Sequence, residues 1–360
     1  MTTTPPSSIL IVRLSAIGDV VHSLPVLDAL RQALPKARIG WLVEELSAPL
    51  LQNHPQLDKL YVIPKKRWRG RWLASFRSEI KPFFAAIRAG GWEATLDLQG
   101  LSKSGLAALG AGGRLRVGFA GKNAREINAL LTNRRVEPRA DDRHVVEQNL
   151  RLLEGLGLTV PPSPPRGCFG VSAEEQEAMR GKLRAVGWAG EPMVALNPGA
   201  GWMSKRWPPA YFGELGKRLA GETGLRPLVL WGPGEEAWRD EIAMVIGPAC
   251  IVAPPTRIRE LVVLISLTRL MVGGDTGPTH MAGPLGIPVI SIFGASDGHR
   301  NRPWAAEAGV MVQRTDIPCV PCWKTVCPLE GDAHLACLRG LTPDAVMEQV
   351  RGWLAGRLGS

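Results

Sequence analysis

Short apolar runs that alternate with helical segments constrain the fold of this 360-residue chain more than any other feature. The runs are continuous in Val, Ile and Leu, which is typical of parallel strands buried on both faces of a sheet. The series stops once, at segment 158–167 (LTVPPSPPRG), because four prolines cannot lie inside a strand or a helix. Strands are expected at 9–14, 37–45, 59–64, 93–99 and 115–120 before this interruption, and at 193–199, 227–232, 269–275 and 288–294 after it.

The restart of the pattern predicts an α/β protein of two Rossmann-like, doubly wound domains facing a central cleft. The chain is long enough for each domain to bury a core of its own. Helices are expected at about 20–33, 208–223, 235–247 and 257–267. The expected organisation is a disordered tail at 1–8, an N-terminal domain at 9–160, a Pro-rich linker at 161–170, a C-terminal domain at 171–342 and a final helix at 343–360.

The chain is basic, with a formal net charge of +10 and a pI near 9.6. This charge favours an anionic partner: nucleic acid, a phospholipid surface, or a phosphorylated or carboxylated substrate. No apolar run approaches the roughly 20 residues that span a bilayer. The first residues, MTTTPPSS, lack the basic and apolar regions of a secretory signal. We therefore expect a cytoplasmic location.

The first strand-to-helix junction, RLSAIGDVVHSLP (13–25), places a carboxylate where ligands bind in such folds. Gly18 permits a tight turn after the strand, and Asp19 comes at the start of the next helix. Asp is a common N-cap, so a purely structural role is one interpretation. The other is a general base that takes a proton from an acceptor hydroxyl.

The junction LNPGAGWMSKRWP (196–208) combines a Gly-rich loop with the cations Lys205 and Arg206. Exposed backbone amides and a cation form a plausible phosphate cradle, although surface lysines are usually only solvated. The loop is not a Walker A motif.

The junction VGGDTGPTHMAGPLGIPVISIFG (272–294) opens a helix at Asp275, Thr276 and Gly277. Free N–H groups at a helix N-terminus favour a pyrophosphate. His280 is expected one turn into this helix, on the same face as Thr276. A helix cap and a buried core histidine would explain the same residues.

Together the three junctions resemble glycosyltransferase family 9, the ADP-heptose:lipopolysaccharide heptosyltransferases. The resemblance runs from Ile9 to about Val350 and rests on GDVVHSLPVL, NPGAGWMSKRWP and DTGPTHMAGPLGIPVISIFG. It implies the GT-B fold, inversion at the anomeric carbon and no catalytic metal or other cofactor. The implied reaction moves heptose from ADP-L-glycero-D-manno-heptose to Kdo-lipid A in the lipopolysaccharide inner core.

The resemblance also implies residue roles. Asp19 matches the catalytic base, and Lys205 matches a lysine that contacts the phosphate and sugar of the donor. The other residues implied to bind the donor are Gly18, Ser204, Glu235, Thr256, Asp275, Thr276, Gly277 and His280.

The segment PKKRWRGRWLASFRSEIKP (64–82) packs basic side chains around tryptophans. A solvated loop or a nucleic-acid contact would explain this composition. The segment also resembles the acceptor side of heptosyltransferase I, as do DLQGLSKSG (97–105) and AREINALL (124–131). Peripheral association with the anionic inner leaflet is expected, because each basic residue near such a surface contributes about 1 kcal/mol. The acceptor-binding residues expected are Lys65, Arg67, Arg69, Gln99, Lys103 and Arg125.

Four cysteines crowd into the segment CVPCWKTVCPLEGDAHLAC as C-x2-C-x4-C-x9-C. The first pair has metal-site spacing, and clustered cysteines in a cytosolic protein favour a metal over disulfides. A four-thiolate zinc or iron site would be structural because it leaves no open position. Two disulfides or free thiols remain alternatives. The residues concerned are Cys319, Cys322, Cys327 and Cys337.

Other functions stay open at this point. A family 9 transferase with another sugar donor or acceptor, including a protein acceptor, fits the same motifs. A nucleic-acid-binding protein would explain the charge but not DTGPTH, so no nucleic-acid partner is expected. A nicotinamide dehydrogenase is disfavoured because the first turn lacks GxGxxG. Retention on DNA or cofactor absorbance would separate these two classes from a transferase.

Overall fold

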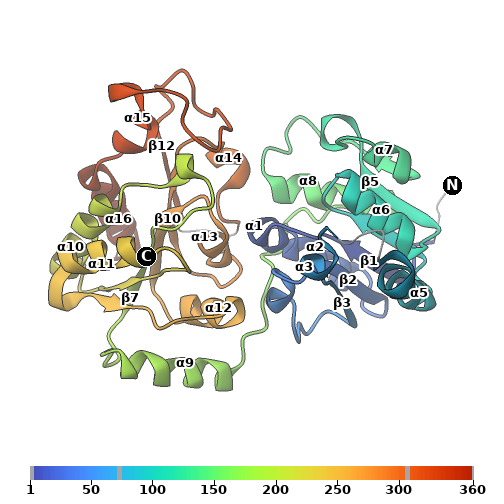
Figure 1. Cartoon of the computed structure of the whole chain (residues 1–360), viewed down its shortest axis with the longest axis horizontal. Coiled ribbons are helices and arrows are strands. Elements are labelled where there is room, and N and C mark those ends of the chain that lie inside the picture. Colours follow the sequence, from blue (N-terminus) through green and yellow to red (C-terminus); the bar gives the residue numbers. More distant parts are fainter. Residues whose placement is uncertain (1–3, 71–74, 305–308, 359–360) are drawn as a thin grey trace. The chain divides into compact units, whose positions relative to one another are not determined.

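The structure is a computed structural model that describes residues 4–70, 75–304 and 309–358. The chain divides into two compact units, Met1–Gly170 and Val171–Ser360. In the described residues each unit contains a sheet of six parallel strands with helices packed against it (Figure 1). The expectation of an α/β protein built from two doubly wound, Rossmann-like sheets is therefore confirmed.

In the N-terminal unit the strand order is β3-β2-β1-β4-β5-β6. The strands are β1 (Ser8–Val12), β2 (Arg38–Glu44), β3 (Lys59–Ile63), β4 (Ala94–Asp97), β5 (Leu115–Phe119) and β6 (Arg134–Val136). The helices are α1 (Ile17–Val21), α2 (Leu24–Ala33), α3 (Lys65–Trp68), α5 (Lys81–Ala89), α6 (Ser102–Ala111), α7 (Asn128–Leu131) and α8 (Val145–Arg151). β1 is buried along its whole length, which explains why its sequence is continuously apolar.

In the C-terminal unit the strand order is β12-β11-β10-β7-β8-β9. The strands are β7 (Met193–Asn197), β8 (Arg226–Val229), β9 (Ile251–Val252), β10 (Leu270–Gly274), β11 (Val289–Phe293) and β12 (Val310–Gln313). The helices are α9 (Ala173–Ala185), α10 (Pro209–Thr223), α11 (Glu236–Ile246), α12 (Ile258–Ser266), α13 (Gly277–Met281), α14 (Gly298–Asn301), α15 (Ala336–Arg339) and α16 (Pro343–Leu358). α16 adds Val346, Met347 and Val350 to the buried core of this unit.

Both sheets follow the same topology. The chain first adds strands on one side of its first strand and then crosses back to add strands on the other side. The reversal lies between β1 and β4 in the N-terminal unit and between β7 and β10 in the C-terminal unit. Ligands of doubly wound folds bind beyond the carboxyl ends of the strands at this switch point. The loops after these four strands are therefore the places to look for a site.

Three details differ from the sequence expectations. The single helix expected at 20–33 is two helices, α1 and α2, because Pro25 in the first turn of α2 cannot continue a preceding helix. The ordered chain also begins earlier than expected: Ser8 opens β1, and the hydroxyl of Ser7 donates a 2.6 Å hydrogen bond to Glu93. Ser7 and Ser8 therefore do not belong to the disordered tail expected at 1–8.

The third difference concerns strands that the pattern missed. β6, β9 and β12 lie at sheet edges and have two to four residues each, too few to show a hydrophobic pattern in the sequence. The segment expected as a linker at 161–170 packs on the N-terminal unit: Phe169 is 2% exposed, and the carbonyl of Cys168 is 2.8 Å from Nε2 of His54.

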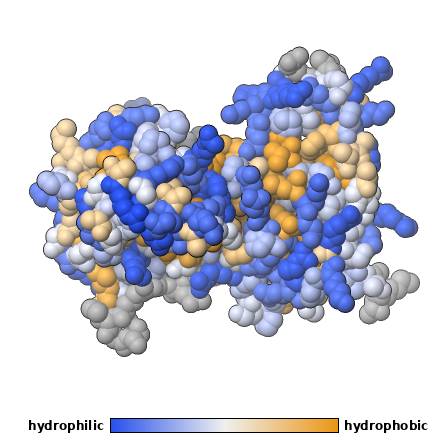
Figure 2. All heavy atoms as spheres, turned by 90° about the horizontal axis from the view of Figure 1, so that it is seen from below, coloured by the Kyte–Doolittle hydropathy of each residue, from blue (hydrophilic) through white to orange (hydrophobic). Residues whose placement is uncertain are grey.

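Hydrophilic side chains cover much of the surface seen in Figure 2, with hydrophobic side chains exposed between them. None of the helices in the described ranges has the length and apolar character that crossing a membrane requires.

Candidate active site

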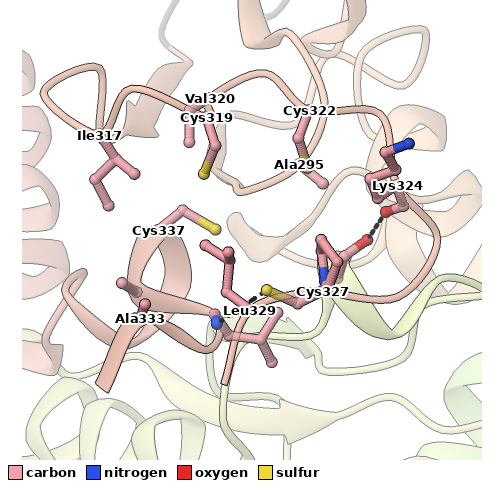
Figure 3. Close-up of a pocket in the computed structure, with 14 residues that line it drawn as sticks. Ala295, Ile317, Cys319, Val320, Cys322, Lys324, Cys327, Leu329, Ala333 and Cys337 are labelled. Carbon is pink, nitrogen blue, oxygen red and sulfur yellow. Dashed lines mark hydrogen bonds between the residues drawn. The ribbon is translucent and has the colours of Figure 1, made fainter. Parts of the chain in front are cut away.

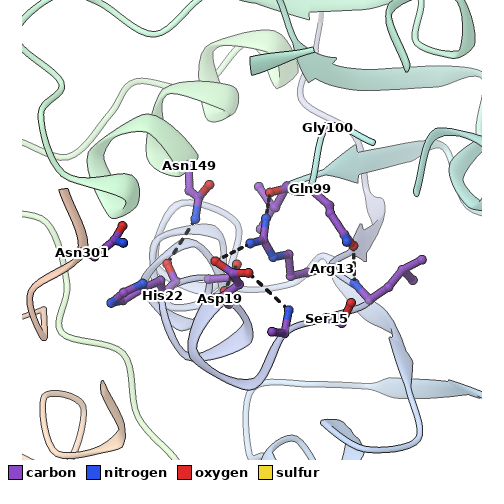
Figure 4. A network of polar contacts seen from close by, with 12 residues as sticks. Arg13, Ser15, Asp19, His22, Gln99, Gly100, Asn149 and Asn301 are labelled. Carbon is purple, nitrogen blue, oxygen red and sulfur yellow. Dashed lines mark hydrogen bonds and ion pairs between the residues drawn. The ribbon is translucent and has the colours of Figure 1, made fainter. Parts of the chain in front are cut away.

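Asp19 lies at the switch point of the N-terminal sheet, where a buried arginine holds it (Figure 4). Arg13 follows β1 directly, and its Nη2 atom is 2.8 Å from Oδ1 of Asp19. Its Nη1 atom donates to the carbonyl of Leu98, after β4. The side chain of Arg13 is 8% exposed and that of Asp19 is 43% exposed. The arrangement orients the carboxylate through a charge-assisted bond and leaves it accessible to a substrate hydroxyl.

The structural interpretation of Asp19 is only partly right. The N-cap of α1 is Ala16, and Asp19 occupies the third helical position, one residue after Gly18. Its Oδ2 atom accepts the backbone N–H of Ala16 at 3.2 Å, as in half of a capping box. The same side chain therefore caps α1 with one oxygen and pairs with Arg13 through the other.

Lys65 and Lys103, which sequence analysis placed on the acceptor side, converge on Glu44. Glu44 ends β2 and its side chain is 9% exposed. The ammonium of Lys65 is 2.7 Å from one carboxylate oxygen, and that of Lys103 is 3.1 Å from the other. Lys103 also donates to the hydroxyl of Ser15 at 2.9 Å, beside the Asp19 loop. Glu44 was missed, although a carboxylate at the end of an expected strand could have marked it.

Gln99 and Arg125 lie in adjoining loops of the N-terminal unit. The side-chain oxygen of Gln99 accepts the N–H of Leu14 at 3.0 Å, just after β1. The N–H of Arg125 donates to the carbonyl of Gly100 at 2.8 Å, so the loops after β4 and β5 adjoin. The Arg125 residue is exposed.

The remaining acceptor-side arginines lie at α3. Arg67 pairs with Glu79 at 2.9 Å, and the indole N–H of Trp68 donates to the same carboxylate at 2.9 Å. Arg69, the residue after α3, is exposed. Residues 71–74 of the basic segment lie outside the described ranges.

In the C-terminal unit Asp275 is the centre of a buried ionic cluster after β10. One oxygen is 2.9 Å from Nε2 of His280, and the other is 2.6 Å from the ammonium of Lys205. The second oxygen also accepts the hydroxyl of Ser296 at 2.5 Å and the amide of Asn301 at 3.4 Å. The Asp275 side chain is 4% exposed.

Burial alone would raise the pKa of Asp275, but the hydrogen bond and charge of His280 and the charge of Lys205 outweigh it. The net effect holds the pKa of this carboxyl well below its usual range. Lys205 also lies 4.3 Å from the ring centroid of Trp202, a cation–π contact. An ammonium has three donors, so Lys205 can hold Asp275 and still donate to a ligand phosphate.

A second polar contact ties the loop after β10 to β7. The amide of Asn197, the last residue of β7, donates to the hydroxyls of Thr276 at 2.7 Å and Thr279 at 3.0 Å. Thr276 is the N-cap of α13, Gly277 its first residue, and the N–H of His280 donates to the Thr276 carbonyl at 3.1 Å. Asn197, Ser296 and Asn301 were missed, because nothing local in the sequence shows that they meet Asp275 and Thr276.

The other donor residues expected from the sequence lie in neighbouring loops at the carboxyl edge of this sheet. Glu235 is the N-cap of α11, and its carboxylate accepts the N–H of Gly232 at 2.8 Å. Thr256 lies half-buried between β9 and α12. Ser204 is 2% exposed, and its hydroxyl donates to the carbonyl of Lys324, so it supports the cysteine segment.

The four clustered cysteines line one cavity of about 210 Å³ (Figure 3). All six cysteines of the chain lie in the described ranges and are free thiols. The N–H of Leu335 donates to Sγ of Cys327 at 3.4 Å, and burial and the charges of the other three cysteines raise the pKa of Cys337. Among the described residues, no three His, Cys, Asp or Glu side chains lie close enough together to hold a metal ion.

Comparison with known proteins identifies a family of similar sequences. The family model of glycosyltransferase family 9 (heptosyltransferase) matches residues 80–332. The lipopolysaccharide heptosyltransferase 1 of Pseudomonas aeruginosa is 28% identical over 96% of this chain and 98% of its own length. The enzyme of the same name from Salmonella typhimurium is 30% identical over 80% of this chain and 89% of its own.

Solved structures agree on the fold. A family 9 glycosyl transferase from Veillonella parvula matches with a TM-score of 0.83 and 19% identity, over 99% of this chain and all of its own. The E. coli heptosyltransferase WaaC with ADP matches with a TM-score of 0.76 and 24% identity, over 96% of this chain and 99% of its own. The fold, the switch-point clusters and the family match agree, and the chain belongs to glycosyltransferase family 9, the heptosyltransferases.

Proposed function

We propose that this enzyme transfers heptose from ADP-L-glycero-D-manno-heptose to Kdo-lipid A, as a heptosyltransferase of the lipopolysaccharide inner core. The observation that carries the proposal is the buried Lys205–Asp275–His280 cluster at the switch point of the C-terminal sheet. A cation oriented by a buried carboxylate at this position suits a nucleoside diphosphate. The names of the curated relatives support heptose as the sugar and lipopolysaccharide as the acceptor.

The proposed chemistry is a single inverting displacement. Asp19 takes the proton of an acceptor hydroxyl, and the oxygen attacks the anomeric carbon of heptose. The bond between that carbon and the diphosphate oxygen breaks, and ADP leaves with the electron pair. Lys205 and the backbone N–H of Gly277 stabilise the charge that develops on the diphosphate. No divalent ion or other cofactor is required by this scheme.

ADP release tests the proposal. The enzyme is given ADP-heptose with and without delipidated Kdo-lipid A, and the rate is compared with that of Asp19→Asn. Release should depend on the acceptor and should fall about 10²–10⁴-fold in Asp19→Asn, the range expected for loss of a general base. Asp344→Asn changes a carboxylate that is 81% exposed on α16 and serves as the matched control.

The outcomes separate the alternatives. Near-normal turnover in Asp19→Asn, with the fold retained, would eliminate Asp19 as the base. If the wild-type enzyme releases no ADP with or without the acceptor but still binds ADP, the remaining function is a family 9 transferase that uses another sugar or another acceptor, including a protein. Binding of nucleic acid in place of ADP would contradict the transferase proposal as a whole.

We propose that Lys65, Arg67 and Arg69 meet the carboxylates and phosphates of the acceptor at the anionic inner leaflet, where the enzyme associates peripherally from the cytoplasm. All three residues are exposed, although Arg67 also pairs with Glu79. Reversing the charges of Arg67 and Arg69 should raise KM for the acceptor and leave KM for ADP-heptose unchanged. Unchanged acceptor kinetics would rule out this segment.

We also propose that Cys319, Cys322, Cys327 and Cys337 hold a structural zinc or iron ion. Support comes from their shared cavity and from the N–H that Leu335 donates to Cys327, a bond typical of thiolates that bind metals. To bind a metal ion, the surrounding loops must bring the thiols closer together, because the thiols do not lie at ligand distances in this structure. Elemental analysis of anaerobically purified protein should find one metal per chain, lost in Cys322→Ser. Its absence would favour free thiols or disulfides.

A further inference from the structure

An exposed apolar surface on the N-terminal unit contains none of the residues proposed to bind the donor or the acceptor. It is formed by Leu106 and Leu109 of α6 and by Ile127 and Leu130 at α7, and is called the α6–α7 surface below. The exposed fractions are 51%, 45%, 51% and 82% in that order. Scattered exposed aliphatic side chains are ordinary, but four of them on or next to two helices that pack together form a patch that marks a contact surface.

Helical periodicity places these side chains on a common outward strip. On α6, Gly105 contacts α7: an added Cβ would lie 2.8 Å from Asn128 Nδ2 and 2.8 Å from Leu131 Cδ1. Gly110 contacts α5, where an added Cβ would lie 2.8 Å from Phe84 Cδ1. Successive residues of a helix are turned by 100°, so Leu106 and Leu109 lie between the side of α6 that contacts α7 and the side that contacts α5. They therefore project outward beside α7.

Buried hydrogen bonds fix the short helix α7 to its neighbours, so its exposed residues belong to a defined helix. Asn128 is fully buried, and its amide donates to Asp97 Oδ2 at 2.7 Å and to the carbonyl of Leu101 at 2.9 Å. Asp97 also accepts the hydroxyl of Ser104 from α6 at 2.9 Å. The buried, hydrogen-bonded carboxylate of Asp97 thus fixes α7 to α6. Leu130 on α7 is 82% exposed to solvent.

The charge of the segment that carries this surface favours one kind of partner. Residues 101–139 contain eight Lys and Arg and two Asp and Glu, a net charge of +6 out of +10 for the whole chain. Lys122, Arg125, Arg134 and Arg135 are exposed. A second copy of the chain docked symmetrically on this surface would bring two such charges together, which is unfavourable. An anionic bilayer complements the charge and accepts the leucines among its acyl chains.

We propose that the α6–α7 surface is a membrane-docking surface that inserts its leucines into an anionic phospholipid bilayer. The proposal goes beyond the transfer reaction and does not depend on the sugar transferred. It differs from the acceptor contacts at α3, because its aliphatic side chains enter the bilayer and do not bind a saccharide.

Sedimentation of the full-length enzyme with vesicles tests the proposal. The vesicles contain phosphatidylglycerol and phosphatidylcholine, or phosphatidylcholine alone. Binding should require phosphatidylglycerol and weaken in high salt. Leu130→Ser should reduce the partition coefficient about tenfold or more, because it removes a buried aliphatic side chain from the bilayer. Met244→Ser alters an equally exposed residue (82%) on α11 and should bind like the wild type.

Three results would overturn the proposal: wild-type binding by Leu130→Ser, an equal loss in Met244→Ser, or a dimer in sedimentation velocity that Leu130→Ser dissociates. The last would make the surface an interface between two copies. Leu109→Ser should also weaken vesicle binding, and because it lies outside the acceptor-side segments 97–105 and 124–131, it should leave ADP release with delipidated acceptor in free solution unchanged. That assay can fail in the wild type while vesicle binding persists, so failure of the transferase proposal is recognised separately.

Discussion

At the scale of single residues, one buried carboxylate in each unit is paired with a buried cation, and only one of the two pairs lies at a candidate site. Asp275 pairs with Lys205 at 2.6 Å, and Asp142 pairs with Arg151 at 2.7 Å; both carboxylates are 4% exposed. The similar geometry makes Asp142 a control for the effects of Asp275, because Asp142 belongs to the N-terminal unit and is not among the residues expected to bind the donor.

Asp275→Asn should lower the free energy of unfolding by about 3–5 kcal/mol, since it leaves the Lys205 ammonium 14% exposed without its anion. It should also weaken ADP binding, because Lys205 loses the partner that orients it. Urea unfolding and calorimetric titration measure the two effects. Asp142→Asn should destabilise the protein without changing ADP affinity. An equal loss of ADP affinity in both variants would refute the assignment of Asp275.

The low pKa of Asp275 also predicts a pH dependence. The folded-state pKa lies below the ordinary value of 3.8, so the contribution to stability is fully present above that value and is lost as the pH falls toward the folded pKa. The unfolding free energy of the wild type should therefore drop more steeply below about pH 4 than that of Asp275→Asn. Parallel acid-unfolding curves for the two proteins would contradict the prediction.

Arg13 acts through Asp19. Arg13→Lys keeps the charge but cannot reach Asp19 and the Leu98 carbonyl together, because an ammonium lacks the forked geometry of a guanidinium. We expect kcat to fall about 10–100-fold with little change in KM for ADP-heptose, as for a misplaced base. Steady-state kinetics separate the two parameters. A purely structural role would instead lower thermal stability and leave kcat per folded molecule unchanged.

At the scale of secondary-structure elements, the position of α7 depends on a glycine. Gly105→Ala should destabilise the protein by about 1–3 kcal/mol, because the new Cβ meets Asn128 and Leu131 at 2.8 Å. Gly181→Ala, inside α9 with no atom near its Cβ, should stabilise the protein by about 0.5–1 kcal/mol through helix propensity. Thermal unfolding compares the pair. A stabilising Gly105→Ala would show that α6 and α7 are not closely packed.

At the scale of the whole molecule, each unit has its own sheet and its own core. All of the expected donor residues except Gly18 belong to Val171–Ser360. The fragment 171–360 should therefore unfold cooperatively and bind ADP with an affinity within about tenfold of that of the full chain. Circular dichroism and calorimetric titration measure both properties. A folded fragment that does not bind ADP would place essential donor contacts in the N-terminal unit.

The sequence by itself determined the fold class and the ends of the strands that carry the site. Buried parallel strands must be apolar along their length, so β1, β7, β10 and β11 are readable as continuous runs. Asp275 directly follows such a strand, and Asp19 and Lys205 come seven and eight residues after one, so their positions could be predicted locally. The edge strands β6, β9 and β12 could not be predicted in this way, because two to four residues are too few to show a hydrophobic pattern.

Only the tertiary structure decided which distant side chains meet. Glu44 receives Lys65 and Lys103 from two other elements, and Asn197 reaches Thr276 across 79 residues of sequence. The hydroxyl of Ser204, a residue expected at the donor, donates to the carbonyl of Lys324, 120 residues away. These contacts depend on strand order and on the crossovers that place β4 beside β1 and β10 beside β7. Local propensity and hydrophobic periodicity extend only a few residues along the chain, so they carry no information about such pairings.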